Sequence, residues 1–302
     1  MDESIDTGFG VRKRFCVVHN PNAGTRGRLL FRNTVRELQR AGCHIFIVDT
    51  TQHERGERIA KDAALSGRFD AIIAAGGDGT LHDVLCGIAG SDIPLGLIPS
   101  GTANVFSREI DLPTTPIALA EALMHGPAFN VPISTCNGRP FTFVVGVGFD
   151  AAAVQIFEKY RARRFGIFGV VAAALAALLI HNGQAIAIRT AEEEWIAHWV
   201  LITRIRRFAG RLKLTPHADI GRSAFQIVSF KQKGKLSLAL QLTRMLFAAP
   251  PQSRDIRISE CHQVFLKGSG SIPVQIDGEL IEGLPLQCQF LTRHVPIITG
   301  NK

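Results

Sequence analysis

The chain has 302 residues and a mass of 32.8 kDa, which exceeds the usual size of a single hydrophobic core, so we expect two domains. Hydrophobic residues make up 46% and charged residues 20% of the sequence, and this globular composition excludes a disordered or fibrous chain. Lys and Arg exceed Asp and Glu by 34 to 26, and the net charge of +8 favours an acidic partner: nucleotide phosphate, nucleic acid or an anionic membrane surface.

The first third of the chain alternates short apolar runs with amphipathic segments. The pattern predicts strands over residues 14–20, 44–49, 70–74 and 94–98, and helices over residues 28–41, 54–65, 81–88 and 116–125. Short buried strands separated by helices are typical of a parallel sheet with right-handed crossovers. Residues 127–132 are expected to form a connector.

Beyond residue 133 the pattern changes to apolar or alternating runs separated by turn residues. These runs are PFTFVVGVGF, QAIAIRT, HWVLITRI, AFQIVSF, HQVFLKG, IPVQID and LQCQFL. Helical patches are expected near residues 154–180 and 236–248, so the pattern predicts an antiparallel β domain with a few helices. We therefore predict one domain over residues 1–132, a second over 133–295, and a tail, 296–302, that packs back on the first. A ligand is expected in a cleft between the two domains.

The six cysteines, at positions 16, 43, 86, 136, 261 and 288, show no CxxC pair and no metal-ligand spacing. This argues against a zinc site and favours a reduced, cytoplasmic setting. The acidic start MDESIDTGFGVRKR lacks the apolar core of a signal peptide. The apolar stretch 166–180 is shorter than the roughly 18 to 20 residues that span a bilayer, so we expect a buried or half-buried helix, with a lipid-facing interfacial helix as the alternative.

The sharpest motif is Gly76-Gly77-Asp78-Gly79-Thr80, which follows a predicted buried strand and opens a helix. Glycines at such a turn let the backbone approach a ligand, and the helix start directs N–H groups and a positive dipole end at an anion. A carboxylate repels phosphate, so Asp78 suggests proton transfer or indirect metal binding. The alternative is a plain glycine-rich turn, in which Asp is common.

Two further loops leave predicted strands in the same way. Pro99-Ser100-Gly101-Thr102-Ala103-Asn104 follows the strand PLGLI, and Asn20-Pro21-Asn22-Ala23-Gly24 follows the first strand. Ligands of parallel sheets gather where strands end, so three such loops predict a nucleotide cradle. The P-loop pattern GxxxxGK[ST] is absent from the sequence. The segment 146–151 obeys GxGxxA but lacks the acidic residue about 20 positions later that a dinucleotide site needs.

Five segments, in this order and spacing, resemble the diacylglycerol kinase catalytic-domain family, which contains bacterial lipid kinases, sphingosine kinases and ceramide kinases. They are NPNAG, AAGGDGTLHDVLCGIA, GLIPSGTANVFSREI, GVGFDA and IDGE, and the similarity covers about residues 12–295. The resemblance implies an α/β nucleotide-binding domain akin to NAD kinase and 6-phosphofructokinase, with a β-sandwich domain behind it. It also implies transfer of the γ-phosphate of ATP to a lipid hydroxyl.

The resemblance also assigns roles to individual residues. Asp78 matches the family's proposed general base, and Asp150 matches an acidic residue near the acceptor lipid. Asp277 and Glu279 match a late motif near the nucleotide and its Mg²⁺, and we count Glu279 with the catalytic residues. The implied nucleotide contacts are Asn20, Thr51 (with Thr50 as the alternative), Gly76, Gly77, Gly79, Thr80, Gly101, Thr102, Asn104, Arg161, Arg164 and Asp277. For the two arginines, a solvated basic helix face is the alternative.

The sequence departs from the family pattern at a few positions. His82, Asp83 and Cys86 stand where the family often has Asn, Glu and Asn, and Val105 follows Asn104 where many members have Asp. The Asp-rich turn that holds a structural metal in some members is reduced to the segment 219–222. These departures put the family's structural metal and its usual preferred substrate in doubt for this chain, and they leave the phosphate cradle intact.

We therefore predict a Mg-ATP-dependent kinase that acts on a lipid hydroxyl, such as that of diacylglycerol or of a sphingoid or ceramide-like lipid. The alternatives are a soluble-substrate kinase of the NAD-kinase type and a non-catalytic lipid- or nucleotide-binding protein with the same fold. Residues 166–180 and 236–249, each flanked by basic residues, are candidates for peripheral docking on the inner membrane face, and the alternative for either is an internal core helix with solvated flanks. A homodimer is one possible assembly. Nucleic-acid binding is not expected, because the positive charge is dispersed and aromatic residues are not interleaved with it.

Overall fold

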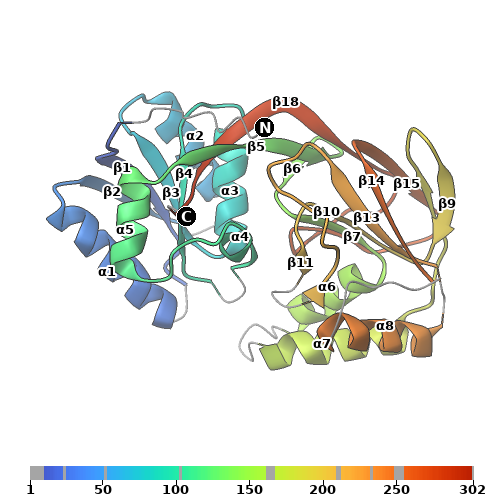
Figure 1. Cartoon of the computed structure of the whole chain (residues 1–302). Helices are drawn as coiled ribbons and strands as arrows, with labels where there is room; N and C mark the ends of the chain where they lie inside the picture. Colours follow the sequence, from blue (N-terminus) through green and yellow to red (C-terminus); the bar gives the residue numbers. More distant parts are fainter. Residues whose placement is uncertain are drawn as a thin grey trace. The chain divides into compact units, whose positions relative to one another are not determined.

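The computed structural model describes residues 10–22, 25–50, 53–101, 104–160, 167–208, 212–231, 234–247 and 255–300. The chain divides into two compact units (Figure 1). The first comprises Met1–Ile133 and Thr292–Lys302, and the second comprises Ser134–Leu291. The division therefore falls one residue after the expected boundary, and the last residues of the chain belong to the first unit.

The first unit contains a parallel sheet with the strand order β2-β1-β3-β4. These strands are β1 (Arg14–His19), β2 (His44–Asp49), β3 (Ala71–Gly76) and β4 (Leu95–Pro99). The end of β18 (Leu286–Ile298) adds a parallel neighbour beside β4, with Ile297 opposite Leu95. The strand β3 is buried along its whole length, so the loop that follows it starts from a fixed point.

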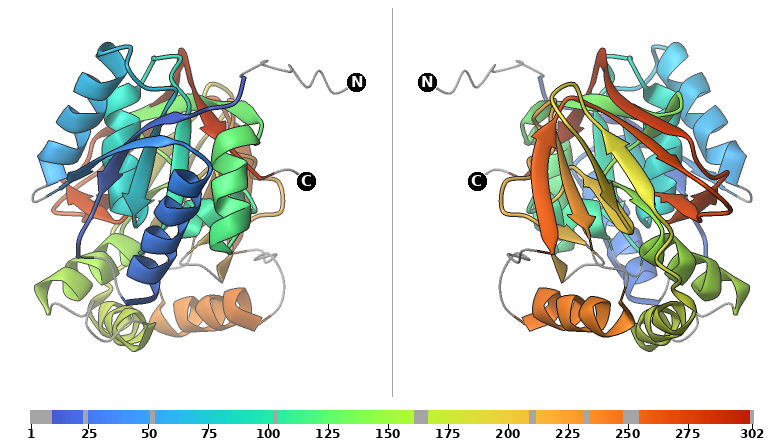
Figure 2. Two further views of the ribbon diagram at one scale, coloured as in Figure 1. Left: turned by 90° about the vertical axis from the view of Figure 1, so that its left-hand side faces the viewer. Right: turned by 90° about the vertical axis from the view of Figure 1, so that its right-hand side faces the viewer.

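Helices pack on both faces of this sheet, as the left view of Figure 2 shows. They are α1 (Thr25–Arg40), α2 (His53–Leu65), α3 (Asp78–Ile88), α4 (Val105–Glu109) and α5 (Pro116–His125). Helix α1 packs with α5, and α2 packs with α3. The helices α2 and α3 lie so close together that a Cβ added at Gly87 would be 2.3 Å from the carbonyl oxygen of Glu57. The first unit is thus a three-layer α/β domain.

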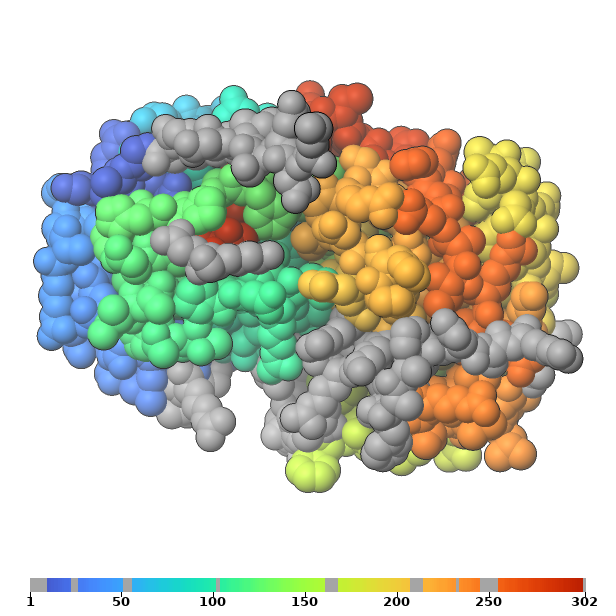
Figure 3. Space-filling model, viewed as in Figure 1, coloured from blue at the N-terminus to red at the C-terminus, as the bar shows by residue number. Residues whose placement is uncertain are grey.

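The two ends of the first unit's chain are fixed by contacts with α5 and the segment behind it. The buried guanidinium group of Arg12 donates to the carbonyl oxygens of Leu123 and Gly126 at the end of α5. The backbone N–H of Thr299 donates to the carbonyl oxygen of Pro127 at 2.9 Å. In Figure 3 a patch of red atoms from this last segment is visible among the green atoms of the first unit.

The second unit is an antiparallel β-sandwich. One sheet has the order β14-β13-β10-β7-β16-β17, and the strands β18, β15, β8 and β9, with β5 and β6, form the other layer. Their bounds are β5 (Ala128–Cys136), β6 (Arg139–Phe141), β7 (Val144–Val147), β8 (Ile186–Arg189), β9 (Glu194–Ala197), β10 (Trp199–Thr203), β13 (Phe225–Phe230), β14 (Ile256–Cys261), β15 (Gln263–Gly268), β16 (Val274–Ile276) and β17 (Glu279–Ile281). A short ribbon pairs β11 (Arg207–Phe208) with β12 (Leu212–Lys213).

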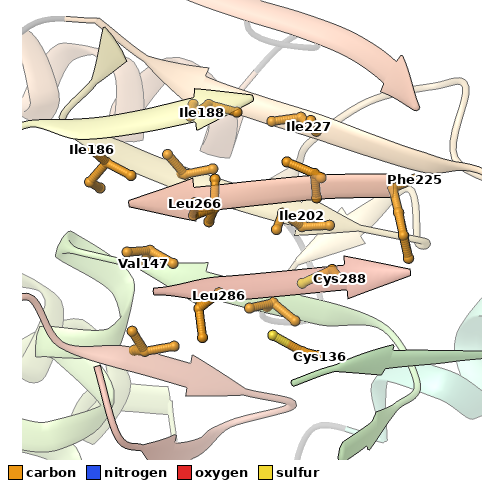
Figure 4. Close-up of a cluster of buried hydrophobic side chains, with 14 of the residues drawn as sticks. Cys136, Val147, Ile186, Ile188, Ile202, Phe225, Ile227, Leu266, Leu286 and Cys288 are labelled. Carbon is orange, nitrogen blue, oxygen red and sulfur yellow. The ribbon is translucent and has the colours of Figure 1, made fainter. Parts of the chain in front are cut away.

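The core of the sandwich lies between its two layers (Figure 4). Ile186, Ile188 and Leu266 reach it from one layer, whereas Ile202 and Ile227 reach it from the other, and all five are fully buried. Because side chains alternate along a strand, the residues between these positions face away from the core. On β10 and β16 some of those outward-facing residues carry polar groups.

Three helices accompany the sandwich in the described part of the chain: α6 (Phe149–Lys159), α7 (Ile167–Ile180) and α8 (Lys235–Phe247). Helix α7 buries Ala173 and Ala177 and exposes large apolar side chains on its other face, so it is half-buried. Among the described helices, none combines the length and the apolar character that crossing a membrane requires.

The structure corrects several expected elements. The helix expected at residues 81–88 begins at Asp78, because Gly77 is extended and its carbonyl oxygen accepts the N–H of Leu81. Residues 127–132 are not a connector: most of them belong to β5, which pairs with β6 and β18. The apolar patch expected near residues 154–180 contains two helices, α6 and α7. Pattern alone missed these limits because Gly, Pro and Ala residues weaken the periodicity.

Candidate functional site

The loop between β3 and α3 is the centre of the candidate site in the first unit. Gly76 ends the buried strand, Gly77 is the N-cap residue with φ −93° and ψ −168°, and Asp78 opens the helix. The first N–H groups of a helix have no partner inside the helix, and they lie at its positive dipole end. Such a loop can therefore bind an anion through its backbone.

The loop after β4 lies directly against the first loop. The backbone N–H of Ser100 donates to the carbonyl oxygen of Gly76 at 2.8 Å, and a Cβ added at Gly101 would lie only 2.5 Å from the Cα of Gly77. Glycine is therefore required at position 101, because any side chain would displace the neighbouring backbone. The two loops form one surface of bare backbone at the carboxyl edge of the sheet.

Asn104 holds the second loop in shape. Its Oδ1 accepts from the N–H of Gly101 at 2.9 Å, and its Nδ2 donates to the carbonyl oxygen of the same glycine at 3.0 Å. Asn104 itself has a φ of +46°, a left-handed conformation that Asn tolerates better than most residues. The side chain thus supports the loop from within, whatever else it binds.

The carboxylate of Asp78 is half-buried and connects the two loops. Its Oδ1 accepts from the backbone N–H of Phe106 in α4 at 3.3 Å. This contact ties the first residue of α3 to the beginning of α4, so the carboxylate has a defined orientation beside the glycine backbone.

The loop after β1 joins the same edge of the sheet. Asn20 donates its backbone N–H to the carbonyl oxygen of Ala75 at 2.9 Å, and its Nδ2 lies 3.5 Å from the hydroxyl of Thr80. Thr50 is buried directly after β2, with its N–H bonded to the carbonyl oxygen of His19 at 2.7 Å. The structure therefore brings Asn20, Gly76–Thr80, Gly101 and Asn104 together within the first unit. Thr51, Thr102, Arg161 and Arg164 lie outside the described residues.

In the second unit, Asp150 occupies a buried position in the first turn of α6. Burial raises the pKa of its carboxyl group to about 6, and hydrogen bonds from Gln275 and Trp199 act in the opposite direction. Trp199 Nε1 donates to Oδ1 at 2.9 Å, and Gln275 Nε2 donates to Oδ2 at 2.8 Å. A Cβ at Gly146 would overlap the carboxylate, so the glycine of β7 leaves the space that Asp150 fills.

Asp277 lies on the turn between β16 and β17, Glu279 is the first residue of β17, and both have partners within the second unit. The Asp277 carboxylate accepts the backbone N–H groups of Thr142, Phe143 and Val144, the last at 2.9 Å. Glu279 forms an ion pair with Arg139. Asp277 has a φ of +50°, so these contacts also hold a left-handed turn in place.

These contacts bear on Mg²⁺ binding. The described residues contain no group of three or more His, Cys, Asp or Glu side chains that could hold a metal ion. The Asp277 oxygens face backbone donors, and Glu279 faces a guanidinium group, so the pair does not fit a resident metal site in this arrangement. A metal role for the two residues stays a prediction.

Sequence reasoning missed two buried polar residues of the second unit. Gln275 is 1% exposed and joins Asp150 to the N–H of Gly278, which its Oε1 accepts at 2.7 Å. Arg204 is equally buried; burial lowers its pKa to about 10, while the charges of Asp277 and Asp219 oppose that shift. The available signal for Gln275 was a polar residue between two apolar ones in the strand VQI. Its partner, Asp150, is 125 residues away in the chain, so the sequence alone did not show the contact.

The two parts of the chain match two family models. Residues 14–136 match the model described as "Diacylglycerol kinase catalytic domain", and residues 143–299 match the "YegS C-terminal NAD kinase beta sandwich-like domain". The chain belongs to the diacylglycerol kinase family that combines these two domains. It is thus an enzyme of the lipid kinase class, and the expected family and fold class are confirmed.

Named relatives are similar to this chain over nearly its full length. The chain is 25% identical to a diacylglycerol kinase of Staphylococcus saprophyticus, covering 96% of this chain and 97% of that protein. It is 26% identical to a diacylglycerol kinase of Bacillus subtilis, covering 95% and 96%. A crystal structure of a diacylglycerol kinase from Bacillus anthracis str. Sterne shares the fold, with a TM-score of 0.74, 18% identity and coverage of 96% and 97%.

Proposed function

We propose that this protein transfers the γ-phosphate of ATP, bound as its magnesium complex, to the hydroxyl group of a lipid. Diacylglycerol is the first candidate acceptor, because the named relatives are diacylglycerol kinases. The observation that carries the proposal is the contact between the Gly77 and Gly101 loops, with the Asp78 carboxylate beside them.

The nucleotide phosphates would lie on the two glycine loops of the first unit. The first loop opens helix α3, and the first backbone N–H groups of a helix suit phosphate oxygens without any side chain. Asn20 and Asn104 add amide groups at the same edge, and Thr51, Thr102, Arg161 and Arg164 remain predicted contacts. Magnesium enters as part of the nucleotide substrate and neutralises phosphate charge there.

Asp78 would act as the general base. The acceptor hydroxyl attacks the γ-phosphorus, a new P–O bond forms as the bond to the ADP oxygen breaks, and the hydroxyl proton passes to the Asp78 carboxylate. The products are a lipid phosphate and ADP. Positioning and charge neutralisation supply most of the catalysis in this type of reaction, and the base contributes roughly 10² to 10⁴ in rate.

Asp150 is the proposed contact of the acceptor in the second unit. A buried carboxylate with two neutral donors can still accept a hydrogen bond from a hydroxyl group, because each oxygen has more than one lone pair. This contact would orient the acceptor rather than take its proton. Glu279 and Asp277 remain predicted contributors, in addition to their structural contacts with Arg139 and with the backbone of residues 142–144.

Helices α7 and α8 are the proposed membrane-facing surface of the second unit. Phe168, Val171, Leu175, Leu179 and Leu236 are each more than half exposed. Lys235 joins the helices through a hydrogen bond from its ammonium group to the carbonyl oxygen of Leu179. Apolar side chains beside a lysine suit an anionic bilayer, and each basic residue near such a surface is worth about 1 kcal/mol. Peripheral association with the inner membrane face and a homodimer are further parts of this proposal.

The experiment is a screen of purified protein with radiolabelled ATP against diacylglycerol, monoacylglycerol, a sphingoid base, ceramide and phosphatidylglycerol in mixed micelles, with NAD in a separate reaction. Thin-layer separation should give labelled phosphatidic acid from diacylglycerol. Label in NADP alone would favour the soluble-substrate alternative. No labelled product from any acceptor, with the fold intact by circular dichroism, would favour the non-catalytic one.

A further inference from the structure

Gln275 is a buried amide on the outer side of its strand. It lies between Val274 and Ile276 of β16, both of which belong to the core of the sandwich, whereas Gln275 does not. Side chains alternate along a strand, so its amide faces the other side of the sheet, where α6 packs. A side chain that is 1% exposed and carries two polar atoms needs a partner for each of them.

Both amide atoms of Gln275 have partners, and the partners fix the amide's orientation. The carboxylate of Asp150 is an acceptor, so the atom 2.8 Å from it must be the Nε2 donor. The backbone N–H of Gly278 is a donor, so the atom 2.7 Å from it must be the Oε1 acceptor. Among standard side chains of this length, only glutamine offers a donor and an acceptor on one planar group without having to bind a proton first. The contacts therefore depend on glutamine at this position.

The amide connects two motifs that are far apart in the chain. Asp150 belongs to GVGFDA, and Gly278 belongs to the IDGE turn that leads into Glu279. We propose that Gln275 is a positioning residue, which fixes the Asp150 carboxylate and couples it to the IDGE turn. Its importance for turnover rests on the proposed function of Asp150 as the acceptor contact, but the coupling itself does not.

The titratable groups around Asp150 decide how the coupling can be observed. Burial raises the pKa of Asp150 to about 6, and the donor from Gln275 holds it below the value that burial alone would give. The titratable residues on or beside the elements that pack with α6 are His181, whose ring meets the edge of Phe149; His198, which precedes β10; Glu279 on β17; and Glu158 and Lys159 at the end of α6 itself. Burial lowers the pKa of His181, and the charges of His198 and Lys235 lower it further. Only a control at Asp150 can separate its titration from theirs.

Trp199 is a built-in probe of Asp150, because its indole N–H donates to the carboxylate. The chain has two tryptophans, and Trp195→Phe leaves Trp199 alone. We expect the fluorescence of this variant to titrate with a midpoint near pH 6 that Asp150→Asn abolishes. Gln275→Leu removes the donor and should raise the midpoint by about one pH unit. Gln275→Glu, which is isosteric, places a second carboxyl group beside Asp150 and should raise it further.

Gln226→Leu is the matched control. Gln226 is also a buried glutamine of the same sheet that donates to a carboxylate, that of Glu260 at 2.7 Å, and it does not contact Asp150. We expect this variant to leave the fluorescence midpoint where it is. Unchanged midpoints in both Gln275 variants would overturn the proposal. If the leucine variant does not fold, the isosteric glutamate variant decides alone.

The pH profile of kinase activity tests the link to function separately. If ionised Asp150 orients the acceptor, the acid limb of kcat/KM should move upward in Gln275→Leu by the same interval as the fluorescence midpoint. A fluorescence shift with an unmoved acid limb would leave the positioning role of Gln275 in place and would refute the acceptor role of Asp150. An unmoved midpoint would refute the positioning role, whatever the activity.

Discussion

The two units build their candidate sites from different materials. In the first unit the site is backbone: Gly77 and Gly101 meet without a side chain between them, and the Gly76–Thr80 loop opens a helix whose first N–H groups have no partner inside the helix. In the second unit the site is side chains: Asp150, Gln275 and Asp277 are buried, and hydrogen bonds satisfy them. Substitutions in the two units should therefore have different effects. Substitutions in the first unit should reduce turnover, whereas substitutions in the second should change stability and proton affinity.

The largest expected effect is at Asp78. Asp78→Asn keeps the size of the side chain and an oxygen for the N–H of Phe106, so the fold should survive, but the amide cannot take the acceptor's proton. We expect kcat to fall by roughly 10² to 10⁴ with an unchanged thermal midpoint. Asp92→Asn, at an exposed position of the same unit, is the control. Near-normal turnover of Asp78→Asn would remove Asp78 from the chemistry.

The next effect tests the backbone contact. Gly101→Ala places a methyl group against the Cα of Gly77 and must separate the loops. We expect a loss of about 10²-fold in kcat/KM for ATP, on the scale that small misplacements in a site produce. Gly10→Ala is the matched control, because nothing lies within 4 Å of an added Cβ there. If both variants bind ATP equally well, the loop contact is unrelated to nucleotide binding.

The sequence predicts the backbone site of the first unit better than the side-chain site of the second. The GGDGT and PSGTAN loops are local patterns at the ends of buried strands, so the sequence alone predicts their convergence at one edge of the sheet. Gln275 could not be assigned a role, because its meaning depends on Asp150, which is distant in the chain and reached only through sheet pairing. Asp277 resembled a metal ligand in sequence, and the three backbone donors that it accepts come from a loop 133 to 135 residues earlier.

The buried carboxyl group of Asp150 in the second unit should make the free energy of unfolding depend on pH. Asp150 has a raised pKa of about 6 in the folded state against 3.8 when unfolded, so the folded state binds the proton more tightly. Its contribution to stability is therefore complete only below the unfolded pKa of 3.8 and is lost as the pH rises through 6. Relative to Asp150→Asn, the free energy of unfolding of the wild type should fall by about 2 kcal/mol between pH 4 and pH 7. Urea titrations at both pH values measure this, and a constant difference would contradict it.

A substitution of Asp277 can distinguish a structural role of this residue from a role in magnesium binding. Asp277→Ala leaves the buried N–H groups of residues 142–144 without their acceptor, so the free energy of unfolding should fall by about 2 to 3 kcal/mol. Glu279→Gln, just after the same turn, should cost less, because its ion pair with Arg139 is partly exposed. If Asp277 instead ligates magnesium, its substitution should raise the magnesium concentration needed for half-maximal activity without that loss of stability.

The smallest expected effect concerns the apolar face of α7 and α8. Leu175 is 59% exposed, so Leu175→Glu should leave the fold intact while it adds a charge that an anionic bilayer repels. Sedimentation with phosphatidylglycerol vesicles should show weaker binding, by roughly 1 to 2 kcal/mol, and activity on micellar lipid should change less than activity on vesicles. Leu65→Glu is the matched control, because Leu65 is 78% exposed at the end of α2 in the first unit. Equal vesicle binding by the two variants would mean that α7 does not contact the membrane.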